Sequence, residues 1–253
     1  MEITLSGRRA LVTGANGSLG RHFAMTLARA GADVAIGARR IEALDDLAAS
    51  IVALGRRAFP VALDVTEMAS VRDAFEQANA GLGPITVVVN NAGIAVTKPL
   101  LEHSEDDWLD VIDVNLNGAW RVAQTAARTM VANAQGGSIV NVASILGLRV
   151  ASQVPSYAAS KAALIQLTKA MALELARHRI RVNALAPGYI ETGINRDFFA
   201  SDAGQAMIKR IPQRRIGTPD ELDAPLLLLG SDAGSYMTGS VVTADGGHLI
   251  NSL

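Results

Sequence analysis

The chain has no cysteine, so it can form no disulfide and cannot use a thiol for catalysis or redox switching. It also lacks a block of basic residues, and its net charge of −1 argues against nucleic acid as a partner. The N-terminal residues show no basic-then-apolar signal pattern, and no apolar run approaches the roughly 18 residues of a membrane span. These absences predict a cytoplasmic protein with no membrane partner.

Histidine is scarce as well, with only four residues in the chain. They are His22, His103, His178 and His248, and they show no spacing typical of metal ligands. We therefore expect no metal site, and we place all four at the surface or at an interface.

Apolar residues make up 49% of the chain and charged residues only 19%, which allows a large core and argues against disorder. A length of 253 residues is normal for one α/β domain. No linker, repeat or low-complexity segment divides the sequence. We therefore predict a single domain over residues 1–253.

Short apolar runs alternate with longer segments of helical periodicity along the whole chain. Strands are predicted over residues 9–14, 33–39, 57–65, 84–93, 137–144, 179–188 and 239–247. Strands rich in Val, Ile and Ala, each followed by a helix, indicate a parallel sheet that is covered on both faces. The fold class is therefore α/β, a doubly wound parallel sheet of seven strands of Rossmann type with helices on both faces.

The segment "TGANGSLG", residues 13–20, follows the first strand and opens a helix. Small residues let the backbone approach a phosphate, and the N-terminus of a helix attracts the anion. This pattern predicts a dinucleotide-binding loop; the alternative is a tight strand–helix turn with no ligand. The candidate cofactor-binding residues of the loop are Gly14, Asn16, Gly17, Ser18, Leu19 and Gly20.

The end of the second strand bears on the choice of cofactor. Asp33 begins that strand, so it lies at the wrong edge of the sheet to bind a ribose. At the correct edge, Ala38 cannot hydrogen-bond a ribose 2′-OH, whereas Arg39 can pair with a 2′-phosphate. We therefore expect NADP(H) rather than NAD, although Arg39 and Arg40 could simply solvate the end of the strand.

Three residues suggest acid–base catalysis on a carbonyl group. Ser144 ends the fifth strand, and Tyr157 and Lys161 lie one turn apart on the next helix, so all three can face one crevice. A nearby lysine and a positively charged nicotinamide ring would lower the tyrosine pKa from its usual value near ~10. Tyr157 could then act as general acid in reduction and general base in oxidation, with Ser144 holding the substrate oxygen.

With these motifs in order, the chain resembles the short-chain dehydrogenase/reductase family, in its single-domain branch. The matching segments are "TGANGSLG", "DVT", "NNAG", "VNL", Ser144, "YAASK" and "PGYIET". The resemblance implies that Asn115 is a fourth catalytic residue that distorts its helix and supports a water relay to Lys161. It also implies cofactor contacts from Asp64, Val65, Asn91, Ala92, Gly93, Pro187, Gly188, Ile190 and Thr192, and from Tyr157 and Lys161 themselves.

A substrate lid is expected over residues 193–217, by similarity to such proteins. The candidate substrate residues are Ile94, Val96, Ser144, Ile145, Leu146, Gln153, Val154, Tyr157, Phe198, Phe199 and Met207. This lining is mostly apolar, which suits a hydrophobic ketone and favours a carbonyl reductase acting on small-molecule ketones or alcohols. Half of these residues could instead only pack the lid or a subunit interface.

Two other substrate classes stay open. A 3-oxoacyl-carrier-protein reductase would need basic residues for its acidic partner; Arg128 fits, but Leu173 stands where we expect an arginine in such proteins. A sugar or gluconate-type dehydrogenase would need a more polar pocket. A cofactor sensor without activity is disfavoured because the residues at 115, 144, 157 and 161 are all present. By resemblance and from apolar helices near residues 161–175 and 224–230, we also expect a homotetramer.

Overall fold

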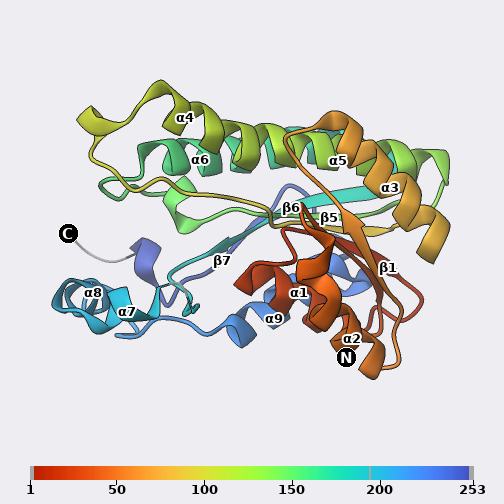
Figure 1. Ribbon diagram of the computed structural model, residues 1–253, viewed down its shortest axis with the longest axis horizontal. Helices are drawn as coiled ribbons and strands as arrows, with labels where there is room; N and C mark the ends of the chain where they lie inside the picture. The colour runs from red at the N-terminus through yellow and green to blue at the C-terminus, as the bar shows by residue number, and fades with distance from the viewer. Residues whose placement is uncertain (1–2, 194, 251–253) are drawn as a thin grey trace.

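The computed structural model describes residues 3–193 and 195–250 of the chain. Its centre is one sheet of seven parallel strands in the order β3-β2-β1-β4-β5-β6-β7 (Figure 1). The expected doubly wound parallel sheet is therefore confirmed, including the number of its strands.

The strands are short and lie where the apolar runs predict them. They are β1 (Arg9–Thr13), β2 (Asp33–Ala38), β3 (Ala58–Ala62), β4 (Val87–Asn90), β5 (Gly137–Val142), β6 (Ile180–Pro187) and β7 (Val241–Ala244). The helices are α1 (Ser18–Arg29), α2 (Asp45–Ala53), α3 (Met68–Leu82), α4 (Glu105–Ile112), α5 (Ala119–Ala132), α6 (Pro155–Leu175), α7 (Arg196–Ala200), α8 (Asp202–Ile208) and α9 (Asp223–Gly230).

Helices cover both faces of the sheet, so its central strands are buried on both sides. On one face α1, α2 and α9 pack against β1 and β2 through residues such as Phe23, Leu27 and Leu226 (Figure 1). On the other face α3, α5 and α6 pack through residues such as Phe75, Val122 and Met130. Alternate residues of one strand serve the two cores, as Leu11 and Val12 of β1 do. This two-sided burial explains why the strands are continuous apolar runs rather than alternating ones.

The strand order reverses between β1 and β4, which pair in parallel through Leu11 and Val88. The connections that leave these two strands run to opposite faces of the sheet, and a crevice opens at their carboxyl ends. The glycine loop follows β1 and residues 91–93 follow β4. The sheet thus brings together two segments that are far apart in the sequence.

The helix that begins after Ser104 is not continuous. Ser104 caps α4 by accepting a hydrogen bond from the Asp107 backbone, and the Asp107 carboxylate accepts one in return. However, Asp113–Gly118 forms a π-helical turn between α4 and α5. Such a turn inserts an extra residue and marks functional positions more often than chance.

The residues 193–217 include α7 and α8, which lie at the left of Figure 1 near the last described residues. Within the described ranges, no helix is both long and apolar enough to cross a membrane. The expectation that every histidine lies at the surface or an interface is wrong for His248, which is 6% exposed and packs against a ring inside the molecule.

Candidate functional site

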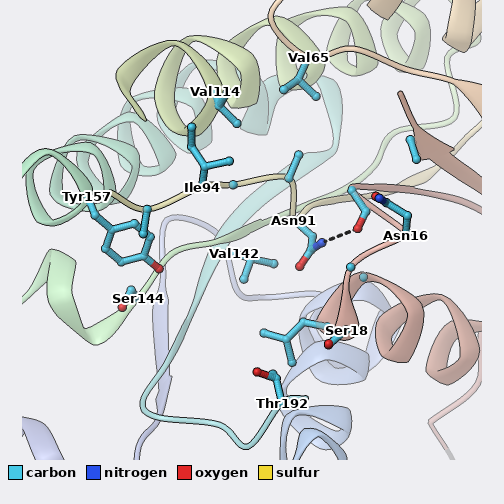
Figure 2. Close-up of a pocket in the computed structure, with 18 of the residues that line it drawn as sticks. Asn16, Ser18, Val65, Asn91, Ile94, Val114, Val142, Ser144, Tyr157 and Thr192 are labelled. Atoms are coloured by element: carbon cyan, nitrogen blue, oxygen red, sulfur yellow. Dashed lines mark hydrogen bonds between the residues drawn. The ribbon is translucent and has the colours of Figure 1, made fainter. Parts of the chain in front are cut away.

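A cleft of about 1360 Å³ opens along the carboxyl edge of the sheet. Its lining includes every residue that the sequence predicts to bind the cofactor. These are Gly14, Asn16, Gly17, Ser18, Leu19, Gly20, Arg39, Asp64, Val65, Asn91, Ala92, Gly93, Tyr157, Lys161, Pro187, Gly188, Ile190 and Thr192. Figure 2 shows several of them facing one space from opposite sides.

The glycine loop owes its path to two glycines. Gly14 has φ +63°, a left-handed conformation that favours glycine, and it lies against the backbone of Ala92. Gly20 lies in the first turns of α1, where a Cβ atom would stand 2.2 Å from the Gly14 carbonyl oxygen. The helix can therefore come close to the loop only because residue 20 has no side chain.

Side chains from β1 and from the residue after β4 fasten the loop to the sheet. The Thr13 hydroxyl accepts hydrogen bonds from the backbone amides of Asn91 (3.0 Å) and Ala92 (2.9 Å). The Asn91 amide donates to the carbonyls of Thr13 (3.0 Å) and Gly14 (3.3 Å). The segment "NNAG" thus holds the two walls of the crevice together (Figure 2).

At the other end of the cleft, Arg39 and Asp64 lie near each other after β2 and β3. The Thr66 hydroxyl donates to the Asp64 carboxylate at 2.7 Å, and the Thr66 amide donates to it at 2.9 Å. The first of these bonds is the main reason why the pKa of Asp64 is lowered, and the charge of Arg39 lowers it further. Arg39 itself is exposed, with its guanidinium free to meet a second anion.

The presumed reacting groups converge at the middle of the cleft. Ser144 follows β5, and its hydroxyl lies close to the Tyr157 hydroxyl at the start of α6 (Figure 2). The Leu146 amide donates to the Ser144 Oγ at 3.1 Å and fixes the side chain. Pro155 opens α6, where the missing backbone N–H of proline costs nothing.

Lys161 lies one turn after Tyr157 and is 4% exposed. Its Nζ donates to the Val142 carbonyl at 2.8 Å and stands 5.6 Å from the centre of the Tyr157 ring. Burial lowers the pKa of Lys161 to about 8. One of the three N–H donors of the Lys161 ammonium is therefore used by Val142 of β5, and the cleft lies beside the other two.

Asn115 lies in the π-helical turn, as its expected distortion of the helix implies. Its Oδ1 accepts from the Ile94 amide at 2.8 Å, and its Nδ2 donates to the Ile94 carbonyl at 2.9 Å and to Ser160 Oγ at 3.1 Å. Ser160 in turn donates to the Tyr157 carbonyl at 2.8 Å. Asn115 thereby links the residues after β4 to the helix that carries Tyr157 and Lys161.

The protein's own groups raise the pKa of Tyr157. Burial has the largest effect and raises this pKa, the nearby Ser144 hydroxyl lowers it, and the charge of Tyr189 raises it again. We expected Lys161 and the nicotinamide charge to lower this pKa. Since the nicotinamide charge acts only when the cofactor is bound, that expectation stays a prediction for the loaded cleft.

Of the predicted substrate residues, Ile94, Ser144 and Tyr157 line the cleft. Ile145 and Phe199 are buried, at 2% and 5% exposed, and pack inside the molecule. The other six predicted substrate residues do not line the cleft: Val96, Leu146, Gln153, Val154, Phe198 and Met207. The Gln153 carbonyl accepts a hydrogen bond from the Lys98 backbone amide at 2.9 Å.

Several wall residues are not among the predicted site residues. They include Val142, which ends β5, Ala143, which follows it, and Tyr189, which lies within the segment "PGYIET". Tyr189 could have been found, because it directly follows Gly188 at the end of β6. Its role depends on contacts with distant residues, which spacing in the sequence does not reveal.

The cleft fits the dinucleotide that the sequence predicts. Gly14 and Gly20 let the loop and α1 pack closely together, so the first turn of α1 presents its backbone N–H groups beside the loop. The cleft continues from there to Arg39 and Asp64 in one direction and to Ser144 and Tyr157 in the other. These are the two ends that an extended dinucleotide would reach.

One group of possible metal ligands lies outside the cleft. His22, Asp220 and Asp223 place their ligand atoms within 4.8 Å of one another. Asp223 already accepts from Thr26 at 2.6 Å and hydrogen-bonds His22 at 2.7 Å, so the group is explained as a polar contact between α1 and α9.

Comparison with known proteins agrees with this geometry. Residues 14–248 match the family model described as "Enoyl-(Acyl carrier protein) reductase". A 2-dehydro-3-deoxy-D-gluconate 5-dehydrogenase from Escherichia coli is 37% identical over 97% of this chain and 97% of its own length. The chain belongs to the short-chain dehydrogenase/reductase family.

Two further members of the short-chain dehydrogenase/reductase family are similar over nearly the whole chain. A 3-oxoacyl-[acyl-carrier-protein] reductase from Thermotoga maritima is 39% identical over 97% of this chain and 99% of its own. The crystal structure of a gluconate 5-dehydrogenase from Burkholderia cenocepacia, in complex with NADP and tartrate, has a TM-score of 0.94. It is 38% identical and covers 99% of this chain and 98% of its own.

Replacement of Gly20 tests the glycine loop. In Gly20→Ala the new Cβ would stand 2.2 Å from the Gly14 carbonyl and 2.8 Å from the Asn91 amide, so α1 or the loop must move. We expect a melting temperature lower by several degrees, because such overpacking costs about 1–3 kcal/mol. Gly17→Ala is the control, since its Cβ would meet only the Gly14 carbonyl, at 3.4 Å. Equal melting temperatures for the two variants would contradict this account of the loop.

Proposed function

We propose that this protein is an NADP(H)-dependent oxidoreductase that interconverts a ketone and a secondary alcohol. The observation that carries the proposal is the meeting of Ser144 and Tyr157 hydroxyls, with Lys161 behind them, in the middle of a dinucleotide-sized cleft. Membership of the short-chain dehydrogenase/reductase family supports the same reaction class.

The cofactor supplies the hydride when it is bound, and the protein must supply the proton. Tyr157 can donate it to the carbonyl oxygen, while Ser144 hydrogen-bonds the same oxygen and orients it. The raised pKa of Tyr157 keeps the phenol protonated at neutral pH, which is the form that reduction needs. Oxidation needs the phenolate, so the reverse reaction gains from higher pH.

Lys161 and Asn115 would help to supply Tyr157 with the proton that it donates. With a pKa of about 8, Lys161 is still mostly protonated at neutral pH but exchanges a proton easily. It would hydrogen-bond the ribose of the cofactor with a donor that Val142 does not use. Asn115 holds Ile94 and Ser160, and thereby the start of α6, in register for a water relay to Lys161.

The preference for NADP(H) is supported by two observations. Arg39 extends from the end of β2 toward Asp64, where the adenosine end of the cofactor would lie, and Ala38 offers no acid to repel a 2′-phosphate. The related gluconate 5-dehydrogenase structure contains NADP.

The substrate class is the finer part of the proposal. Carbonyl reduction names the reaction class but not the substrate. The apolar lining that suggested a hydrophobic ketone is largely absent from the cleft, because Ile145 and Phe199 are internal. For a carrier-protein substrate, Leu173 is 84% exposed at the position where an arginine was expected. The gluconate-type relatives favour a polyhydroxylated acid, the substrate of the sugar or gluconate-type dehydrogenase that the sequence left open.

Tyr157→Phe tests the proton donor. We expect turnover to fall by about 100-fold or more, because general acid–base catalysis contributes roughly that much, while NADPH binding is retained. Initial rates of NADPH oxidation with a ketone and titration of NADPH fluorescence would measure the two effects. Tyr236→Phe is the control, since Tyr236 is fully exposed and outside the cleft. Full turnover in Tyr157→Phe would show that Tyr157 is not the proton donor.

Arg39→Ser tests the cofactor preference. Loss of a bidentate charge-assisted contact with the 2′-phosphate should lower kcat/KM for NADPH about 10- to 100-fold and leave that for NADH nearly unchanged. The exposed Arg29, at the end of α1, provides the control variant Arg29→Ser. A wild-type protein that prefers NADH would show that Arg39 only solvates the strand end.

We also propose that the protein is a homotetramer. Large apolar side chains are exposed on the layer of α4, α5 and α6, among them Trp108, Leu109 and Leu173. The run "APLLLLG" supports this less than its sequence suggested, because Leu226 and Leu229 of α9 are already fully buried within the chain.

The mass in solution tests this assembly. Light scattering at micromolar concentration should give four times the chain mass of 26.4 kDa. Leu173→Glu should lower that mass, because it would place a charge in an apolar contact. Val52→Glu is the control, as Val52 is 58% exposed on α2 of the opposite layer. A monomer mass for the unmodified protein would overturn the assembly.

A further inference from the structure

At the Tyr157 end of the cleft, the wall includes a second tyrosine. Tyr189 lines the cleft there, and it is close enough to Tyr157 for its charge to raise the pKa of that phenol. The Tyr189 ring packs on His248 with 5.5 Å between ring centres, and on Phe199 with 5.6 Å. Tyr189 thus connects this end of the cleft to Phe199 of the lid and to His248 after β7, which are not themselves part of the cleft lining.

Arg149 brings a positive charge to this place. It belongs to the loop that begins at Ser144, it is half-buried, and its guanidinium donates to the His248 carbonyl. Burial raises the pKa of Tyr189 and lowers that of His248, and the nearby charge of Arg149 lowers both. Among the ion pairs between described residues, none includes Arg149.

Two arginines and one carboxylate act on the pKa of His248. After burial, the charge of Arg149 lowers this pKa, Asp245 raises it and Arg210 lowers it. The Asp245 carboxylate accepts hydrogen bonds from the backbone amides of Gly247 (2.9 Å) and Leu249 (2.7 Å). The two positive charges near His248 therefore outnumber the one negative charge, whose oxygens are already hydrogen-bonded.

His248 itself has an unused polar atom. The side chain is 6% exposed, and its Nδ1 has no hydrogen-bond partner among the described residues. A buried polar atom without a partner is unfavourable, so a ligand that hydrogen-bonds it would be bound more tightly. Because its pKa is lowered, the ring is neutral at neutral pH and can donate or accept according to its tautomer.

We propose that Arg149, together with His248 and Tyr189, binds a carboxylate of the substrate. This inference rests on the proposed function, and it names the substrate as a keto or hydroxy acid whose carboxylate lies some atoms away from the reacting carbon. The guanidinium fork matches a carboxylate with two parallel hydrogen bonds. The reacting oxygen stays at Ser144 and Tyr157, so the two ends of the substrate are held by the two ends of one loop.

The test compares an acid with its uncharged counterpart. The reduction of 5-keto-D-gluconate and of its methyl ester by NADPH is followed, and kcat and KM are measured for each. We expect kcat/KM to be at least about 10-fold higher for the acid, a contrast typical of one hydrogen-bonded charge. In Arg149→Gln the acid-to-ester ratio should fall to near one, mainly through KM. Arg177→Gln, an exposed change on the turn after α6, is the control and should keep the ratio.

Arg149→Lys guards against a merely structural effect, because it keeps a charge that can reach the His248 carbonyl but loses the fork. It should give an intermediate ratio. A second readout is the melting temperature of the NADP⁺-loaded protein, which D-gluconate should raise for the wild type and not for Arg149→Gln.

The outcomes separate the two proposals. A wild-type ratio near one, or a ratio that Arg149→Gln leaves unchanged, overturns the carboxylate site. Turnover of an aryl ketone or an acetoacetyl thioester without turnover of the acid also overturns it, while the proposed function stands. No turnover of any ketone with either cofactor would overturn the proposed function, and the carboxylate site with it.

Discussion

The site depends on one buried hydrogen bond, from the Lys161 ammonium to the Val142 carbonyl at 2.8 Å. This bond sets the distance between α6 and the end of β5, and so it decides how Tyr157 faces Ser144. Moving an ammonium away from water is costly, which is why the pKa of Lys161 falls to about 8. Asn115 helps to stabilise this arrangement, because its three hydrogen bonds hold Ile94 and Ser160 around the same helix.

The parallel sheet turns this local arrangement into a site for two molecules. Its strand order reverses between β1 and β4, so a groove for an extended ligand exists before any specific contact is made. Thr13 and Asn91 then fix the two walls of that groove, and the absence of a side chain at Gly20 lets the helix N-terminus approach. Cofactor binding and proton transfer are thus separate tasks of neighbouring strand ends.

The sequence alone predicted the sheet, its seven strands and the cofactor side of the cleft, because these follow from apolar periodicity and from residues that lie next to strand ends. It did not predict the substrate side. Phe199 and Ile145 are apolar in the same way whether they face a ligand or the interior, and only packing distinguishes the two. The cluster of Arg149, Tyr189 and His248 brings together residues from three segments that are distant in the sequence, so no local sequence pattern predicts it. The burial that raises the pKa of Tyr157 cannot be read from spacing either.

The π-helical turn at Asp113–Gly118 separates α4 from α5, which would otherwise form one continuous helix. An extra residue in the turn changes the rotation of α4 about its axis relative to α5, so the two faces need not share one periodicity. The exposed Trp108 and Leu109 of α4 therefore do not have to follow the periodicity that packs α5 against the sheet. Asn115 lies in the turn between the two helices, so the outer face of α4 and the inner face of α5 are oriented independently on either side of it.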